Sequence, residues 1–233
     1  ETIDYIVSNY SAIRDFENDI DYLNYASTFD KYFFKTVPVQ KHSSDKDLQK
    51  WIDELGLELI KDSLLKLASK KNKGINHEVL KYIDRPLLLE WLLSLYTYAM
   101  CNKNLTEYKP NYTVHADGQI KGYAIGQRAG ESGADAIAFT DNEFFILEPT
   151  LLTGVTQYNR ESYSNHEHLE SEIKKNPNKT GYCLQISPEP HLRTIRYAKD
   201  RKDWDKLNMI PISISEYIEK IEENKSLGIF LNN

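Results

Sequence analysis

The chain has 233 residues, of which 40% are hydrophobic, 27% charged and 12% aromatic, and this composition argues against a disordered or low-complexity protein. Its formal net charge of -6 at pH 7 disfavours tight nonspecific binding of nucleic acid by charge alone, although a catalytic site concentrates carboxylates and a tethered domain supplies local concentration. The sequence has two cysteines without CxxC spacing, no signal peptide and no apolar run long enough to cross a bilayer. We therefore expect a cytoplasmic protein with no membrane contact.

The first part of the chain, residues 1–105, is predicted to be helical. Its apolar residues recur at helical spacing, for example at Leu57, Ile60 and Leu64. Pro86 is expected in the first turn of a helix, where its missing N–H costs no hydrogen bond, and the same helix then carries Glu90. Because the sequence begins with Glu1 rather than Met, we expect it to be part of a longer polypeptide or a chain whose ends are missing. This helical portion is expected to pack on, or lead into, residues 106–233.

Strands are predicted after residue 110, where short runs of apolar residues replace the helical spacing. The expected strands are Tyr112–His115, Gly122–Ile125, Ala134–Phe139 and Phe144–Leu147. The turn Asp141-Asn142 predicts that the last two strands form a hairpin.

The rest of the chain alternates between helix and strand. We expect a helix between Tyr158 and Lys175, a strand at Tyr182–Ile186, a helix at His191–Trp204, a strand at Met209–Ile214 and a helix at Ser215–Glu223. Ser215 is the expected N-cap of that last helix. The order of elements predicts an α/β (α+β) protein with a mixed sheet, flanking helices and a helical N-terminal portion.

Two carboxylates stand at the ends of the predicted hairpin strands. Asp135 lies at the start of an apolar strand and Glu148 follows Phe144–Leu147, so each needs a cation or hydrogen-bond donors if it is buried. In a hairpin the two residues lie side by side at one end, which favours a site for a hard divalent cation. The alternative is two edge carboxylates that face water, and the spacing alone slightly favours it.

Three polar residues follow on the next predicted helix. Gln157, Glu161 and His168 are four and seven residues apart, which places them on one face of a continuous helix. A solvated polar face is the alternative interpretation. His166-Glu167-His168 is a weak transition-metal pattern, and the surrounding carboxylates favour Mg²⁺ or Mn²⁺ over zinc.

These residues together resemble a known family. The segment Glu148-Pro149-Thr150-Leu151-Leu152-Thr153-Gly154 begins thirteen residues after Asp135, and Gln157, Glu161 and His168 follow it. This pattern is similar to that of the AlwI-type family of restriction and nicking endonucleases. The resemblance covers about Gly122 to Ile218, whereas the helical first half matches only loosely.

The resemblance implies a diverged PD-(D/E)XK nuclease core with Asp135, Glu148, Glu161 and His168 as catalytic residues. Ala134 stands where the usual signature has Pro, and Thr150 stands where it has Lys, although the AlwI family also lacks that Lys. Pro149 replaces the family's Val and removes one backbone N–H, which a sheet tolerates only if that position faces away from the neighbouring strand.

The same resemblance implies a metal cofactor and a set of supporting residues. Asp135, Glu148 and the Pro149 carbonyl are expected to hold Mg²⁺, with Mn²⁺ able to substitute. Glu90 is the candidate for the family's additional N-terminal glutamate. Gln157 and Thr150 are expected to support the site.

Enzymes of this family cut double-stranded DNA at a fixed distance outside an asymmetric site, in the manner of type IIS enzymes. The sequence contains no helix-turn-helix or zinc-finger spacing, so we expect recognition to lie in a further domain or a larger subunit. Cleavage of both strands requires two active sites, which implies a transient dimer or a second subunit.

Two other functions are compatible with the residues. Asp135 and Glu148 also suit the acid and base of a glycoside hydrolase, and the aromatic content suits sugar stacking. A noncatalytic interaction domain on a nuclease scaffold is the second alternative. Magnesium dependence distinguishes the first from a nuclease, and uncut plasmid DNA would indicate the second.

Overall fold

The computed structural model describes residues 41–42, 44–69, 75, 77, 80, 83, 85–110, 113–114 and 133–231. The chain divides into two units, Glu1–Val39 and Gln40–Asn233, and every described residue belongs to the second. The helices within it are α3 (Asp45–Leu55), α4 (Leu57–Ala68), α5 (Arg85–Cys101), α6 (Gly154–Lys175), α7 (Leu192–Asp205) and α8 (Ile214–Asn224), with 3-10 turns η2 (Asn102–Asn104) and η3 (Leu227–Phe230). The strands are β1 (Lys41–His42), β2 (Glu107–Pro110), β3 (Thr113–Val114), β4 (Ala136–Phe139), β5 (Glu143–Pro149), β6 (Thr180–Ser187) and β7 (Asn208–Ser213).

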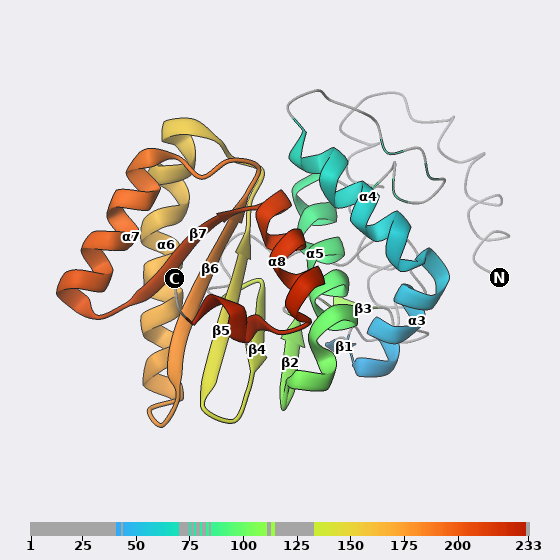
Figure 1. The fold of residues 1–233 in the computed structure, drawn as a ribbon, viewed down its shortest axis with the longest axis horizontal. Helices are drawn as coiled ribbons and strands as arrows, with labels where there is room; N and C mark the ends of the chain where they lie inside the picture. Colours follow the sequence, from blue (N-terminus) through green and yellow to red (C-terminus); the bar gives the residue numbers. More distant parts are fainter. Residues whose placement is uncertain are drawn as a thin grey trace, which may run out of the picture. The chain divides into compact units, whose positions relative to one another are not determined.

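Five of these strands form one mixed sheet in the order β2-β4-β5-β6-β7, and β1 pairs separately with β3. The pairs β2–β4 and β4–β5 are antiparallel, whereas β5, β6 and β7 run parallel. Parallel neighbours need crossover connections, which α6 and α7 supply. Figure 1 shows α6 and α7 on one side of the sheet and α5 and α8 on the other.

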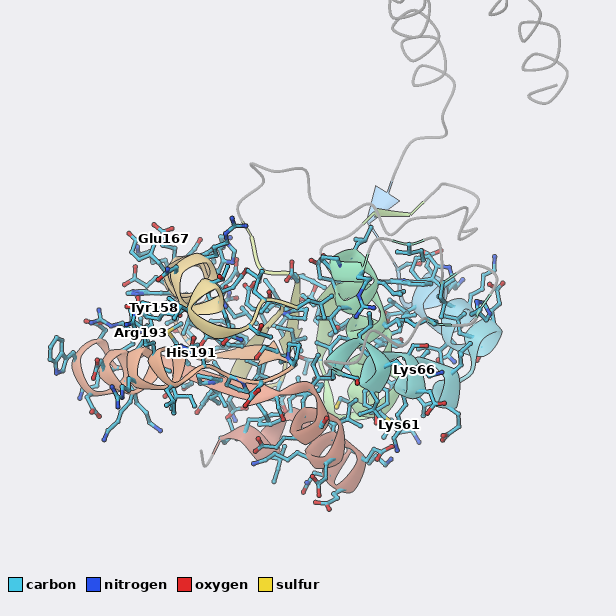
Figure 2. All side chains as sticks on the ribbon, turned by 90° about the horizontal axis from the view of Figure 1, so that it is seen from above. Lys61, Lys66, Tyr158, Glu167, His191 and Arg193 are labelled. Carbon is cyan, nitrogen blue, oxygen red and sulfur yellow. The ribbon has the colours of Figure 1, made fainter. Side chains whose placement is uncertain are left out.

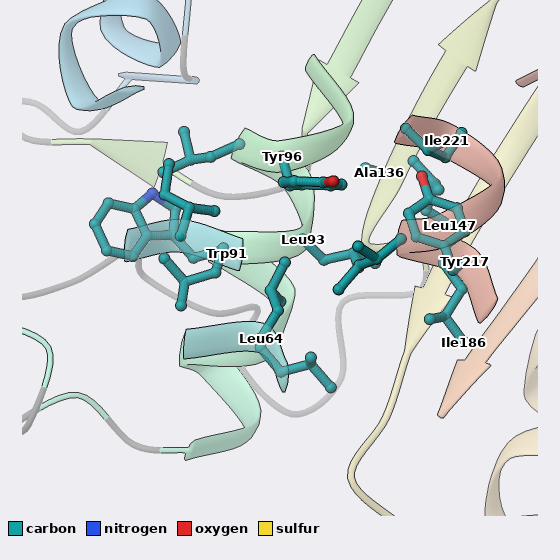
Figure 3. Close-up of a cluster of buried hydrophobic side chains, with 14 of the residues drawn as sticks. Leu64, Trp91, Leu93, Tyr96, Ala136, Leu147, Ile186, Tyr217 and Ile221 are labelled. Atoms are coloured by element: carbon teal, nitrogen blue, oxygen red, sulfur yellow. The ribbon is translucent and has the colours of Figure 1, made fainter. Parts of the chain in front are cut away.

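The larger hydrophobic core lies between the sheet and the helices α5 and α8. Side chains that alternate along the strands, such as Leu147 of β5 and Ile186 of β6, meet Tyr217 and Ile221 of α8 in this core (Figure 3). Residues of α3, α4 and α5 belong to the same cluster. The helical portion therefore packs directly on the sheet within Gln40–Asn233, while the division into residues 1–105 and 106–233 remains a prediction.

The structure confirms the predicted α/β class and most of the expected elements. The β4–β5 hairpin turns at Asp141-Asn142, and α6, β6, α7 and β7 follow in the expected order. Within the predicted strand Tyr112–His115, Thr113 and Val114 form β3, whereas Gly122–Ile125 lies outside the described residues. No membrane-crossing helix of sufficient length and apolarity occurs within the described ranges.

Two expectations about individual elements were wrong. Sequence patterning gave no strand at Glu107–Pro110, yet β2 forms an edge of the sheet there, with Tyr108 and Pro110 buried. The N-cap of α8 is Ser213 rather than Ser215, because the helix begins at the fully buried Ile214. The Ser213 side chain accepts a hydrogen bond from the backbone N–H of Glu216, as an N-cap should.

Candidate active site

A pocket of about 600 Å³ opens where β5 ends. Three parts of the fold supply its walls: the beginning of α5, the β4–β5 hairpin with the loop that follows it, and the middle of α6. Its lining residues are Pro86, Glu90, Gly133, Asp135, Glu148, Pro149, Thr150, Leu151, Leu152, Glu161, Ser164, Asn165, Glu167 and His168. Asp135, Glu148, Glu161, His168 and Glu90, the residues expected to be catalytic, are therefore all in one pocket.

The hairpin brings Asp135 and Glu148 together as the spacing predicted. Ala136 of β4 pairs with Leu147 of β5, so the next residue outward on each strand, Asp135 and Glu148, lies at the same end of the ladder. Strand alternation turns both toward the face that α6 covers, since Ile146, two residues before Glu148, packs in the smaller core on that face. Glu148 is 6% exposed and therefore needs a polar partner.

Pro149 is tolerated in β5 for the reason that the sequence suggested. The next residue, Thr150, donates its backbone N–H to the Ile186 carbonyl of β6. Backbone groups alternate in direction along a strand, so the Pro149 nitrogen and carbonyl point to the opposite side, where the β4 ladder has already ended. Pro149 therefore costs β5 no hydrogen bond to β6, and its carbonyl points to the side of β5 on which Asp135 lies.

The helix α6 presents His168 and Glu161 to this pocket. The His168 Nδ1 atom lies 2.8 Å from Glu148 Oε1, which ties the middle of α6 to the end of β5. Glu161 lies about two helical turns earlier on α6, and the Thr150 hydroxyl is 3.5 Å from Glu161 Oε1. Thr150 thus contacts the site at the position where the usual nuclease signature has a lysine.

Gln157 is on the predicted face of α6 but does not line the pocket. Its Oε1 accepts a hydrogen bond from the backbone N–H of His191 at 2.8 Å and lies 3.4 Å from the Thr194 hydroxyl, so it fixes the beginning of α7. Figure 2 shows Tyr158 of α6 and His191 at the beginning of α7 on the same side of the sheet. A rise of 1.5 Å per residue puts Gln157 and His168 about 16 Å apart along the helix, too far to share one ion.

Three pocket residues of α6 were not among the expected site residues. Ser164 and Asn165 follow Glu161 by three and four residues, so the helical period that selected His168 also indicates them. Glu167 also lines the pocket, although the sequence drew attention to it only within His166-Glu167-His168.

Burial and mutual repulsion shift the ionisation of the carboxyl groups. The pKa of Asp135 is raised well above its ordinary value, chiefly by burial and then by the negative charges of Glu148, Glu90 and Glu161. The pKa of Glu148 is also raised well above its ordinary value, first by burial and then by the negative charges of Glu161 and Glu90. Burial also raises the pKa of Glu161, against the opposing hydrogen bond from Thr150. A nearby cation would relieve this repulsion and favour the charged forms.

The ionisation of His168 shifts in the opposite direction. Burial lowers its pKa, while the charges of Glu167 and Glu161 act against that change. The ring is therefore biased toward its neutral form near pH 7, in which one ring nitrogen donates and the other accepts. When Glu148 is ionised, as a bound cation would favour, Nδ1 donates to it and Nε2 is the acceptor.

The donors of the pocket suit a hard divalent cation. No Lys or Arg is present among the described residues that line it, and its charged groups are carboxylates. Across the described part of the chain, no three His, Cys, Asp or Glu side chains are grouped so that they hold a metal ion by themselves. Mg²⁺ does not require three, because it commonly takes one or two carboxylates and completes its shell with water and substrate phosphate. Asp135, Glu148 and the Pro149 carbonyl fit that pattern.

Comparison with known proteins identifies one matching family. The model of the AlwI restriction endonuclease family matches residues 14–219, which is more than half of the chain. A comparison with curated proteins gave no match.

Two solved structures are similar to this one in different degrees. The small subunit of the heterodimeric restriction endonuclease R.BspD6I aligns at 22% identity with a TM-score of 0.52, over 70% of this chain and 77% of that one. Protein VC1899 from Vibrio cholerae aligns at 13% identity with a TM-score of 0.38, over 82% of this chain and 57% of that one. The first likeness shows a shared fold, and the second is too weak to support one.

Proposed function

The chain belongs to the AlwI restriction endonuclease family, and on this premise we propose that its carboxylate pocket hydrolyses a DNA phosphodiester with the help of a divalent cation. Family membership supports a DNA endonuclease, and metal dependence is the finer proposal. One observation carries it: Glu90, Asp135, Glu148 and Glu161 come from three separate parts of the fold into one pocket whose described lining contains no basic residue except His168. Such a cluster is costly to ionise without a cation.

Asp135, Glu148 and the Pro149 carbonyl would hold Mg²⁺ or Mn²⁺, and Glu90 of α5 lines the same pocket. When bound, the cation polarises the scissile phosphate, activates a water molecule and stabilises charge on the departing oxygen. The end of the hairpin would position these ligands, because Asp135 directly precedes the paired Ala136 and Glu148 directly follows the paired Leu147.

His168 is the proposed acceptor of the proton from the attacking water. Its Nδ1 contact with Glu148 fixes the ring, and Nε2 makes no hydrogen bond with any described residue, so it can take up the proton. Glu161, held by Thr150, is placed to orient the same water. With His168 as the proton acceptor and Glu161 orienting the water, the reaction would not need the lysine of the usual PD-(D/E)XK signature.

The proposed substrate and partners follow from the family. We propose that the chain acts on double-stranded DNA in the cytoplasm, as the cleavage part of a type IIS-like enzyme that cuts outside its recognition site. Recognition would come from a further domain or a larger subunit, and the structural neighbour is itself one subunit of a heterodimeric enzyme. Cutting both strands would then require a transient dimer or that second subunit.

Replacement of either hairpin carboxylate tests the proposal. Asp135→Asn and Glu148→Gln keep the side-chain shape but remove the charge that holds the cation, so we expect at least about a thousandfold slower plasmid cleavage in Mg²⁺. The measurement is supercoiled plasmid relaxation at high chain concentration, with and without a chelator.

Asp47→Asn is the matched control, because Asp47 is a buried carboxylate on α3 that lies outside the pocket lining and contacts Ser44. It should leave cleavage unchanged. Chelator-resistant cleavage would contradict the metal role, and plasmid left intact by the wild-type chain in both Mg²⁺ and Mn²⁺ would favour a noncatalytic domain.

A further inference from the structure

Gln185 of β6 is a buried amide that the proposed reaction does not use. It is 6% exposed, and neither its Oε1 nor its Nε2 has a hydrogen-bond partner in the described residues. A buried polar atom without a partner costs about 1–3 kcal/mol, so the folded protein keeps this amide at the expense of its stability. A side chain of this kind calls for a hydrogen-bond partner, which the described residues do not offer in their present arrangement.

The position of Gln185 indicates which group that partner is. In the parallel pairing of β5 and β6, Gln185 is the direct neighbour of Glu148. Strands in a sheet lie about 4.8 Å apart and neighbours of this kind face the same side, so the amide is within reach of the Glu148 carboxylate. Asp135, Glu148 and Gln185 therefore form a row across three adjacent strand positions.

Glu148 has one oxygen to spare for this contact. His168 Nδ1 approaches Oε1 at 2.8 Å, and no hydrogen bond from a described residue reaches Oε2. Gln185 lies on the β6 side of Glu148, whereas His168 contacts it from α6. A carboxylate held from both sides has little freedom to rotate, which is what an ion ligand with fixed geometry needs.

We propose that Gln185 is a positioning residue for Glu148, donating its Nε2–H to Oε2 when the carboxylate is charged and binds a divalent cation. The inference rests on the proposed function, since it requires the cation site. A neutral amide suits the task because it orients the carboxylate without adding a positive charge that would compete with the cation.

The alternative is that Gln185 only fills space between the sheet and α6. The two interpretations differ in what a methionine of similar volume would do. A space-filling role predicts unchanged cation binding, whereas a positioning role predicts weaker binding without any loss of stability in the metal-free protein, because the unpartnered amide is gone.

The experiment compares the wild-type chain with Gln185→Met, using Mn²⁺ alone as the probe. We expect the dissociation constant for Mn²⁺ to rise about 10- to 100-fold, the range typical of residues that orient metal ligands. The melting temperature measured in chelator should be unchanged or higher. In cleavage assays the variant should need more Mn²⁺ but approach the wild-type maximal rate.

Ser63→Ala is the control, since it removes another buried polar group without a hydrogen-bond partner among the described residues, the Ser63 hydroxyl on α4. It should not change the affinity for Mn²⁺. Equal Mn²⁺ affinity of Gln185→Met and wild type would overturn this inference alone, whereas absence of Mn²⁺ binding by the wild-type chain would overturn the proposed function together with it.

Discussion

The two faces of the sheet differ in what the strands bury. The face that α5 and α8 cover buries apolar residues, whereas the face that α6 covers also buries the Glu148 carboxylate and the Gln185 amide. β5 shows the difference within two residues: Leu147 points into the large apolar core, and Glu148 points toward α6. On the α6 face, Glu148 and Gln185 are the next residues along β5 and β6 after the apolar residues of the smaller core. One layer supplies stability, and the other holds polar groups whose burial opposes it.

This contrast explains how a site with costly burial persists in a folded protein. Buried carboxylates and amides reduce the free energy of unfolding unless they find partners. The apolar layer offsets that cost from the opposite side of the same strands. The contrast can be tested by changing matched residues on the two faces.

The largest change in stability is expected at Leu147. Leu147→Ala removes a side chain that is 1% exposed from the apolar core, so the free energy of unfolding should fall by about 2–5 kcal/mol. Denaturant unfolding of the metal-free chain measures it. A loss below about 1 kcal/mol would mean that the core on this face collapses around the cavity and that the two faces differ less than we infer.

The neighbouring substitution Glu148→Gln should act in the opposite direction. Folding raises the pKa of Glu148 above its ordinary value of 4.5, so the folded state binds more protons than the unfolded state between these two values. Stability is therefore lost as the pH rises through the folded pKa. Without metal, the wild-type melting temperature should fall from pH 5 to pH 8, and Glu148→Gln should melt higher than wild type at pH 8.

That gain should disappear near pH 4, where Glu148 is protonated in both states. Asp135 and Glu161 also have raised pKa values, so part of the pH dependence should remain in the variant. Mg²⁺ should stabilise the wild type more than the variant at pH 8. A variant that melts lower than wild type at pH 8 would show that Glu148 is stabilised by its contacts rather than strained.

The sequence was sufficient to predict the hairpin and the polar face of α6 because both depend on local periods. Apolar strands joined by Asp141-Asn142 and carboxylates thirteen residues apart define the pairing almost completely. It was not sufficient for β2, whose Glu107–Pro110 segment has charged residues at alternate positions and a proline. Its place in the sheet depends on pairing with β4 and on Tyr108 reaching Ser94, which are contacts distant in sequence.

The site shows the same limit. A helical wheel places Gln157 with Glu161 and His168, but the axial rise separates them, and Gln157 instead holds α7. Gln185 could not be related to Glu148 from the sequence, because they become neighbours only through the parallel register of β5 and β6. Local pattern identified the residues, whereas long-range pairing determines which of them meet.

The smallest effects are expected from removing single hydroxyls on the two faces. On the apolar face, Thr97 donates to the Leu93 carbonyl and its oxygen lies 2.7 Å from the Tyr217 hydroxyl, which must then be the donor of that second bond. Tyr217→Phe leaves the Thr97 oxygen without its donor and should lower the free energy of unfolding by about 1 kcal/mol.

On the α6 face, the Ser162 hydroxyl is buried without a partner among the described residues, so Ser162→Ala loses no hydrogen bond and gains helix propensity. It should stabilise the metal-free chain by about 0.5 kcal/mol. Paired denaturant unfolding curves compare the two, and a loss of 1 kcal/mol or more in Ser162→Ala would show that the polar layer is satisfied in solution, so that the two faces differ in composition but not in strain.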